Sequence, residues 1–340
     1  MSAPIIELQN VTRTFQLKQD QVITAVDDLS LSIAAGEIVC LVGESGCGKT
    51  TAGKLIAGLL QPSKGRVLYK GQDISTLKSQ TRKDYRLGVQ LIHQDPYASL
   101  NPMHTIYQSI AAPIRHHQLA IGEAAVRNRV KELLEMVDLT PSTDFLDKFP
   151  HQLSGGQRQR VSIARVLTVN PSFIVADEAV SMVDVSIRIN LLNTLLNLKE
   201  EIELAVLFIT HDLALARYFA WDGRIGVMYL GRLIECSSAQ DLIQHPQHPY
   251  TRALLTAIPE ANPEIAHRKK KIELRSMDIP NLLDLPPGCN FHPRCPIWEG
   301  EQCETVVPVL KFFTDGSSVA CHPIQRERSV EIINPDPQSA

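Results

Sequence analysis

The sequence predicts an α/β fold with a mostly parallel core sheet, an antiparallel β-layer and an inserted helical subdomain. Three observations favour this fold class. A glycine-rich loop at residues 43–51 follows a short apolar run and precedes a helical pattern. The largely apolar runs at 171–178 and 204–210 have the length of strands buried on both faces. Residues 5–11 and 25–33 alternate apolar and polar side chains, which is typical of half-buried strands.

The composition limits the class of protein. The chain has 340 residues, 44% of them hydrophobic, and a net charge of −3, which does not suggest a nucleic-acid-binding face. No signal peptide is evident, and no apolar stretch approaches the roughly 20 residues needed to cross a bilayer. We therefore expect a soluble cytoplasmic protein, unless a partner brings it to a membrane. Seven cysteines without an export signal favour metal ligation over disulfides for any cluster.

The first strands lead to an aromatic residue of interest. The runs at 5–11 and 25–33 flank a polar hairpin expected around residues 18–21. Phe15, just before the hairpin, is either an aromatic packed at the sheet edge or a platform for an adenine ring.

The loop at residues 43–51 fits the phosphate-binding pattern G-x-x-x-x-G-K-[ST]. A strand is expected before it at 37–42 and a helix after it over 52–60. Glycines let backbone N–H groups face an anion, and the helix start adds its positive dipole end. Lys49 can then reach the β- and γ-phosphates of a nucleotide, and the Thr50 hydroxyl can bind Mg²⁺.

Between the loop and residue 167 the pattern changes from strands to helices. Strands are expected at 66–69 and 89–93, with a solvated helix or loop at 78–86 between them. The second strand ends on Gln94, which is either a surface side chain or a contact for Mg²⁺ and an attacking water. Residues 97–167 look mostly helical, which predicts the inserted subdomain.

A second glycine-containing segment, Leu-Ser-Gly-Gly-Gln-Arg-Gln-Arg, occupies residues 153–160 and opens a helix that runs to Leu167. Ser154 is a good N-cap, and the two glycines free backbone N–H groups for an anion. The same pattern also fits an ordinary capped helix start. One chain does not need two γ-phosphate sites on separate subdomains, whereas a head-to-tail dimer does.

Two later strands end on candidate catalytic side chains. The run at 171–176 delivers Asp177, which can hold Mg²⁺ through water, and Glu178, which can then polarise the attacking water. The run at 204–210 is followed by His211, which by itself fits a packed or surface histidine better than a phosphate contact.

Taken in order, these motifs resemble the nucleotide-binding domain of ABC transporters over residues 5–258. The Leu-Ser-Gly-Gly-Gln segment discriminates, because most other P-loop ATPases lack it. The segments 94–102, 227–232 and 245–255 are similar to those of the oligopeptide/dipeptide importer subfamily. Within it, Tyr-Ala-Ser-Leu-Asn at 97–101 resembles the F-type ATPase subunit more than the other ATPase subunit.

The resemblance implies a role for each candidate. Glu178 is expected to be the general base, with His211 at the γ-phosphate and Gln94 sensing it and coupling to the membrane subunit. Mg²⁺ is expected at Thr50, Gln94 and Asp177. The residues expected to contact ATP, in this chain or across a dimer, are Phe15, Ser45, Gly46, Cys47, Gly48, Lys49, Thr50, Thr51, Ser154, Gly155, Gly156, Gln157 and Asp184.

The chain departs from the family after Glu178. Ala179, Val180 and Met182 replace the usual proline, threonine and smaller residue, while Ser181 and Asp184 are kept. Ala179 loses the fixed φ of proline, and Met182 adds bulk at an expected dimer contact. We expect hydrolysis to persist, although one of two composite sites could be slow.

A C-terminal extension is expected over 259–330, with a linker to about residue 285 and a disordered tail at 331–340. Its cysteines have the spacing C-x5-C-x7-C-x17-C, without the paired C-x2-C knuckles of zinc ribbons. The block resembles the extension of peptide-importer ATPases, where such a set is associated with a [4Fe–4S] cluster. Zn²⁺ and unligated thiols are the alternatives. The four residues are Cys289, Cys295, Cys303 and Cys321.

The expected function is ATP binding and hydrolysis that powers an ABC importer for peptides or related solutes. The resemblance implies a second ATPase subunit, two transmembrane permease subunits and an extracytoplasmic solute-binding protein as partners, and no nucleic acid. It places the chain peripherally on the cytoplasmic face of the membrane. The alternatives are a soluble ABC ATPase without a transport role and a catalytically slow partner in an asymmetric ATPase pair.

Overall fold

The computed structural model describes residues 4–17, 21–95, 99–257 and 272–333. Its centre is a nine-stranded sheet in the order β13-β11-β12-β10-β9-β3-β8-β7-β6. The five strands from β9 to β6 are parallel, and the others pair antiparallel. The parallel strands are β3 (Ile38–Val42), β6 (Val89–Ile92), β7 (Phe173–Asp177), β8 (Ala205–Thr210) and β9 (Arg224–Tyr229).

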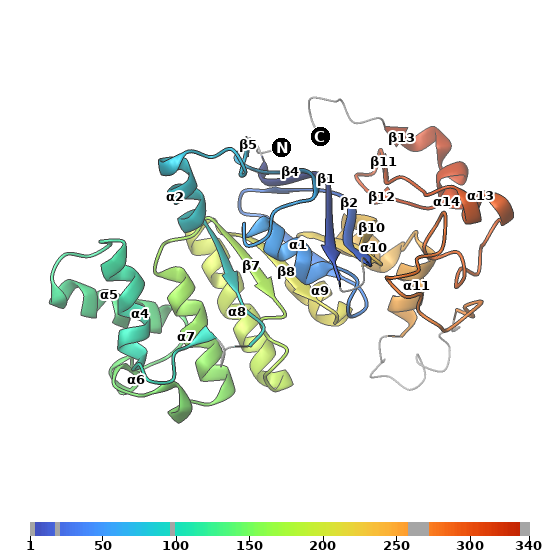
Figure 1. The fold of residues 1–340 in the computed structure, drawn as a ribbon. Helices are drawn as coiled ribbons and strands as arrows, with labels where there is room; N and C mark the ends of the chain where they lie inside the picture. Colours follow the sequence, from blue (N-terminus) through green and yellow to red (C-terminus); the bar gives the residue numbers. More distant parts are fainter. Residues whose placement is uncertain (1–3, 18–20, 96–98, 258–271, 334–340) are drawn as a thin grey trace.

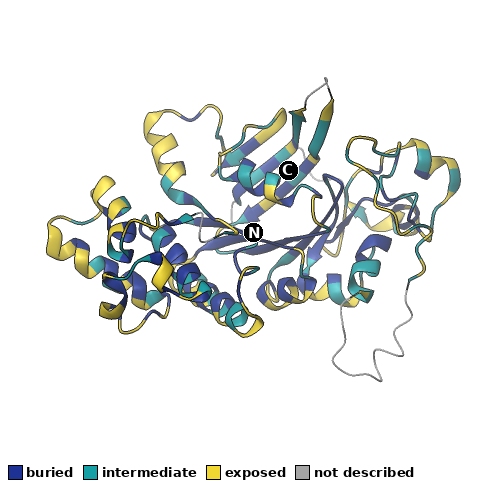
Figure 2. Cartoon of the chain, turned by 60° about the horizontal axis from the view of Figure 1, so that its bottom comes forward, coloured by how far each residue is buried: buried dark blue, intermediate teal, exposed yellow. Residues whose placement is uncertain are grey.

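The parallel strands are mostly apolar because both faces of the sheet are covered. Ile38, Cys40 and Val42 of β3 face one hydrophobic core, and Val39 and Leu41 face another. Figure 2 shows the sheet buried almost throughout, with exposed residues on the outer helices. Packing on both faces holds the strands in place. The residues that directly follow the strand ends are therefore held in place as well.

An antiparallel sheet of four strands, in the order β2-β1-β4-β5, covers one face together with the helix after the P-loop. Its strands are β1 (Pro4–Gln16), β2 (Val22–Ala34), β4 (Lys64–Tyr69) and β5 (Gln72–Asp73). The predicted antiparallel layer is thus confirmed.

The helices divide between the core and an inserted helical subdomain (Figure 1). Those near the core sheet are α1 (Lys49–Ile56), α2 (Ser79–Gly88), α8 (Val185–Ile202), α9 (Leu213–Phe219), α10 (Ala239–Gln244) and α11 (Pro249–Thr256). The subdomain contains α4 (Ile106–His116), α5 (Glu123–Met136), α6 (Thr143–Leu146), the 3-10 helix η2 (Pro150–Gln152) and α7 (Gly155–Leu167).

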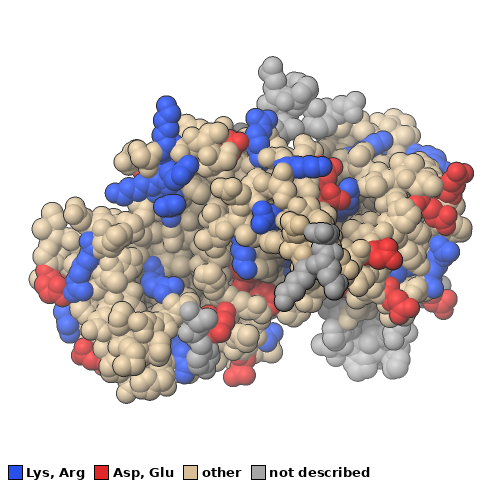
Figure 3. Space-filling model, viewed as in Figure 1, with Lys and Arg blue, Asp and Glu red and all other residues tan. Residues whose placement is uncertain are grey.

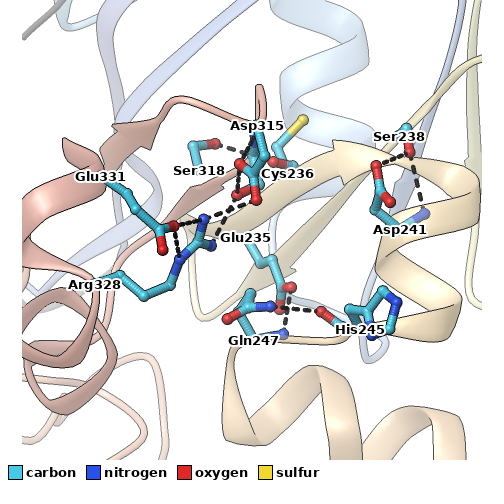
Figure 4. A network of polar contacts seen from close by, with 11 residues as sticks. Glu235, Cys236, Ser238, Asp241, His245, Gln247, Asp315, Ser318, Arg328 and Glu331 are labelled. Carbon is cyan, nitrogen blue, oxygen red and sulfur yellow. Dashed lines mark hydrogen bonds and ion pairs between the residues drawn. The ribbon is translucent and has the colours of Figure 1, made fainter. Parts of the chain in front are cut away.

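The C-terminal extension continues the core sheet instead of forming a separate body. Its strand β12 (Ser318–Val319) pairs with β10 (Arg232–Ser238), and Ser318 Oγ donates to the Cys236 carbonyl at 3.2 Å. Figure 4 shows this junction, together with Arg328 bonded to Asp315 and Glu331. The other described elements are β11 (Lys311–Phe313), β13 (Ile332–Ile333), α13 (Gly300–Thr305), α14 (His322–Glu327) and η3 (Ser329–Glu331).

Two boundaries differ from the sequence prediction. The helix expected over 52–60 starts at Lys49 and ends at Ile56, because Gly58 takes a φ of 68° and the Leu59 N–H bonds back to the Lys54 carbonyl at 2.9 Å. Residues 332–333, expected to belong to a disordered tail, instead pair with β11, and residues 334–340 lie outside the described residues. The hairpin tip at 18–20, residues 96–98 of the segment 94–102, and residues 258–271, which include the first part of the expected linker, lie outside the described residues.

The surface carries both signs of charge. On the face drawn in Figure 3, lysines and arginines gather over α2, whereas acidic side chains gather over the extension. In the described part of the chain, none of the helices combines the length and the apolar character that crossing a bilayer requires.

Candidate functional site: a nucleotide site at the ends of the parallel strands

The P-loop connects β3 to α1 and is shaped by its lysine. Lys49 Nζ donates to the backbone carbonyls of Gly43 at 2.8 Å and Glu44 at 2.9 Å. Gly48, the N-cap of α1, has a φ of 104°, and a Cβ there would lie 2.1 Å from the Ala25 carbonyl oxygen. Only glycine fits this position, so backbone N–H groups at the helix start remain open to an anion.

Thr50 and Asp177 meet at the edge of this loop. Thr50 Oγ1 donates to Asp177 Oδ1 at 3.1 Å. Burial raises the pKa of Asp177, and the charge of Glu178 adds to that rise, while the Thr50 hydrogen bond opposes it. A buried carboxylate with a hydroxyl beside it is a fitting donor set for Mg²⁺, which prefers oxygen ligands.

Glu178 lies at the centre of a cluster of polar side chains. Its Oε2 accepts hydrogen bonds from Gln94 Nε2 at 2.9 Å and from Ser181 Oγ at 3.2 Å. Its Oε1 lies 3.3 Å from His211 Nδ1. Glu178 has a φ of 47°, a strained value for this residue type that the surrounding contacts hold in place.

Gln94, Glu178 and His211 line one cavity of about 420 Å³ together with residues of the P-loop. The predicted phosphate-binding loop and the ends of three parallel strands therefore converge on one space. Its lining residues are Ala25, Ser45, Gly46, Gly48, Lys49, Thr50, Thr51, Gln94, Glu178 and His211.

Several predicted residues lie outside the cavity lining. Cys47 is buried behind the loop, with its thiol 3.6 Å from Lys49 Nζ. The Phe15 ring is half-buried and has the Arg13 guanidinium 4.7 Å from its centroid. Asp184 is exposed at the N-cap of α8.

The Ser-Gly-Gly-Gln segment is also absent from the cavity lining. Ser154 caps α7: its Oγ accepts from the Gln157 N–H at 3.2 Å, and Gln157 Oε1 accepts from the Ser154 N–H at 3.0 Å. A Cβ on Gly156 would lie 2.6 Å from Ile187 Cγ2, so glycine is needed for α7 to approach α8. Within a single chain, the nucleotide cavity is therefore lined by the P-loop and not by the Ser154–Gln157 segment.

The four cysteines of the extension are close neighbours without forming a recognisable metal site. Burial, with a contribution from the other cysteines of the cluster, raises the pKa of Cys295 and of Cys321 to about 12 each. All four thiols are free. Among the described residues, however, no three or more His, Cys, Asp or Glu side chains stand in a group that could hold a metal ion. The predicted metal centre is therefore not confirmed.

Sequence reasoning missed the residues that support the P-loop from outside. The Glu44 N–H donates to Tyr250 Oη at 3.0 Å, and the Arg294 guanidinium pairs with the Glu44 carboxylate at 3.2 Å. Ala25 also lines the cavity, although nothing in its residue type suggests it. A lone arginine between cysteines gave no sequence signal for such a contact.

Two family models match the chain. The model described as "ABC transporter" matches residues 26–181, and the one described as "Oligopeptide/dipeptide transporter, C-terminal region" matches residues 234–303. The oligopeptide transport ATP-binding protein AppF of Bacillus subtilis (strain 168) is 42% identical over 325 residues, which are 94% of this chain and 97% of AppF. The chain belongs to the ABC transporter ATPases. It therefore binds and hydrolyses ATP, as the motif order predicted.

Other similar proteins support the same family assignment. The putative oligopeptide transport ATP-binding protein YkfD of the same Bacillus strain is 41% identical, over 94% of this chain and 95% of YkfD. The ATP-binding cassette MJ0796, solved as a dimer bound to ADP and Pi, has a TM-score of 0.62 and 30% identity, over 69% of this chain and 98% of that one. The cbiO1 protein of Clostridium perfringens, at 23% identity with a TM-score of 0.63, shares the fold over 78% of this chain and 99% of its own.

Proposed function

We propose that the chain is the ATP-hydrolysing subunit of an importer for peptides or related solutes. The names of AppF and YkfD, both oligopeptide transport ATP-binding proteins, support this cargo class. So does the match of residues 234–303 to the oligopeptide/dipeptide transporter model. The proposed partners are a second ATPase subunit, two transmembrane permeases and an extracytoplasmic solute-binding protein, with this chain on the cytoplasmic face of the membrane.

The observation that carries the proposal is the separation of the two nucleotide-binding halves. The cavity contains the P-loop, Gln94, Glu178 and His211, whereas the segment at 154–157 lies elsewhere. We infer that two ATP molecules bind between paired subunits, each contacting the P-loop of one chain and the Ser154, Gly155, Gly156 and Gln157 segment of the other. The dimeric state of the related cassette MJ0796 supports such pairing.

Hydrolysis in this arrangement is an in-line attack of water on the γ-phosphate. The Glu178 carboxylate accepts the proton of the attacking water, and Gln94 and His211 hold that carboxylate in place through the bonds described above. Lys49 stabilises the charge that develops on the phosphate oxygens. Thr50, Asp177 and Gln94 would hold Mg²⁺, which when bound neutralises phosphate charge.

A second cavity, of about 930 Å³, is the proposed contact with the permease. It lies between α2 and β6 on one side and the helical subdomain on the other. Arg82, Arg86 and Arg165 line it, and among its described lining residues there is no aspartate or glutamate. A cationic groove suits a permease segment with carboxylates or exposed carbonyl groups.

For the extension at 259–330, we propose that Cys289, Cys295, Cys303 and Cys321 hold a [4Fe–4S] cluster, with Zn²⁺ as the alternative. The four thiols are free of disulfides, and the other three raise the pKa of Cys321, which supports a shared ligand set. Anaerobic purification followed by iron, sulfide and zinc analysis tests this. Iron and sulfide near four atoms each per chain would support the cluster, about one zinc would select the alternative, and neither metal would refute both.

The importer proposal is tested by purifying the tagged chain from gently solubilised membranes. Two multi-span permeases, a second ATPase and a solute-binding protein are expected to co-purify, and peptide is expected to stimulate ATP hydrolysis by the complex. Ribosomal or other soluble partners alone would refute transport and leave the ATPase assignment standing.

A further inference from the structure

The C-terminal extension reaches back to the P-loop through one buried arginine. Arg294 Nη1 donates to both carboxylate oxygens of Glu44, at 3.3 and 3.2 Å, and Nη2 donates to Oε1 at 3.3 Å. The Arg294 side chain is only 6% exposed and that of Glu44 is 26% exposed, so the guanidinium is shielded from water and the carboxylate partly so. Ion pairs of this kind fix geometry better than exposed ones, because less solvent competes for the charges.

An aromatic cluster keeps this arginine in place. Arg294 Nη1 also donates to Tyr229 Oη at 3.3 Å, and its guanidinium carbon lies 5.7 Å from the ring centroids of both Tyr229 and Phe291. Tyr250 packs on Tyr229 with centroids 4.7 Å apart and accepts the Glu44 N–H. Glu44 is therefore held at its side chain by Arg294 and at its backbone by Tyr250.

Glu44 connects this cluster to the phosphate-binding lysine. Its carbonyl accepts from Lys49 Nζ at 2.9 Å, so movement of the Glu44 backbone would shift the position of Lys49. Its carboxylate also places a negative charge beside a site for a triphosphate. The Arg294 guanidinium offsets this charge, which otherwise repels the nucleotide.

We propose that Arg294 is a positioning residue for ATP. It fixes the P-loop through Glu44 and neutralises the Glu44 charge, so that the extension completes the nucleotide site of the same chain. The proposal rests on the ATP site alone and depends neither on the transported solute nor on a metal at the cysteines. Failure of either of those proposals would leave it intact.

The test is a double-mutant cycle in the full-length protein. Binding of a slowly hydrolysed ATP analogue with Mg²⁺ is measured for wild type, Arg294→Met, Glu44→Gln and the double variant. Arg294→Met is expected to weaken binding about tenfold, within the coupling seen in shared polar networks. Adding Glu44→Gln is expected to restore part of that loss, because it removes the unpaired carboxylate. The KM for ATP should rise more than kcat falls.

Controls separate this role from general stabilisation. Arg326 of the same extension forms a surface pair with Glu299, so Arg326→Met should leave ATP binding unchanged. Arg294→Lys, which keeps the charge, should bind the analogue more tightly than Arg294→Met. If Arg294→Met does not fold, the same cycle is measured with Arg294→Lys and Glu44→Gln. The criterion is again that the double variant recovers part of the analogue binding lost in the arginine variant. Wild-type affinity in a folded Arg294 variant, or losses at the two positions that simply multiply, would overturn the proposal.

Discussion

Glu178 is oriented by protein contacts on both of its carboxylate oxygens. Gln94 and Ser181 bond Oε2, and His211 stands beside Oε1. Its geometry is therefore fixed by three separate segments of the chain: the end of β6, the loop after β7 and the end of β8. A base held in this way needs little reorganisation when it accepts a proton.

We predict that Glu178→Gln reduces ATP hydrolysis by the complex at least about 100-fold, the scale of general-base catalysis, because an amide cannot accept the proton. Binding of ATP with Mg²⁺ should persist, since Glu178 is not needed to hold phosphate. The measurement is phosphate release alongside nucleotide affinity. Glu200→Gln, an exposed glutamate on α8, is the matched control and should behave as wild type. An unchanged rate for Glu178→Gln would assign this chain the slow role in an asymmetric pair.

The residues around Glu178 were predictable because each follows a recognisable strand or motif. The P-loop motif pointed to Lys49 and Thr50, and strand ends pointed to Gln94, Glu178 and His211; all five line the same cavity. The pair of Arg294 with Glu44 was not predictable, because it joins residues 250 positions apart through packing that no local pattern encodes. Long-range contacts of this kind depend on the tertiary fold, which sequence periodicity does not specify.

At the scale of single elements, α11 depends on a buried neutral histidine. His248 is its N-cap and accepts the Tyr250 N–H through Nδ1 at 3.1 Å. Burial, together with the nearby charge of Arg252, lowers the pKa of His248 to about 3. The helix also carries Tyr250, which supports the P-loop, so its stability matters for the nucleotide site.

We predict that the protein loses stability as the pH falls below the ordinary histidine range. Between about pH 6.5 and 3, unfolded chains bind a proton at His248 that folded chains do not, which lowers the free energy of unfolding by up to about 1.4 kcal/mol per pH unit. Urea unfolding at pH 7 and pH 5 measures this loss. His248→Asn, which keeps a cap acceptor, should reduce the dependence, and exposed His245→Asn should not. Equal slopes for both variants and wild type would contradict the assignment.

Element boundaries were predictable where local chemistry sets them and not where partners do. The parallel strands β3, β6, β7 and β8 were correctly predicted because burial on both faces leaves mostly apolar runs, whereas β9 was not predicted. The end of α1 at Ile56 could have been read from Gly58, whose positive φ stops the helix. The short strands β11, β12 and β13 could not, because two or three residues acquire strand structure only by pairing with β10 and one another.

At the scale of the whole molecule, the two cavities face different partners in our proposal. The smaller one needs a second ATPase subunit, because the Ser154 segment lies outside it. The larger one is bordered by both the core and the helical subdomain, so a permease segment seated there would sense how the two parts move. Gln94, at the end of β6, contacts Glu178, while Leu91 and His93 of the same stretch line the larger cavity. This stretch therefore connects the hydrolysis site with the proposed permease contact.

We predict that reversing one charge in the larger cavity separates permease binding from ATP binding. Arg82 lines it and is exposed, so Arg82→Glu places a carboxylate where the described lining has only cationic or neutral groups. Co-purification with the permeases should fall at least about tenfold, the range for a disrupted interface charge, while affinity for ATP stays at the wild-type value. Lys83→Glu makes the same change on the next residue of α2, which is exposed but outside the cavity, and should leave the complex intact. Equal loss with both variants would mean that the net charge on α2, and not the cavity, governs assembly. No loss with Arg82→Glu would mean that the permease does not bind in this cavity.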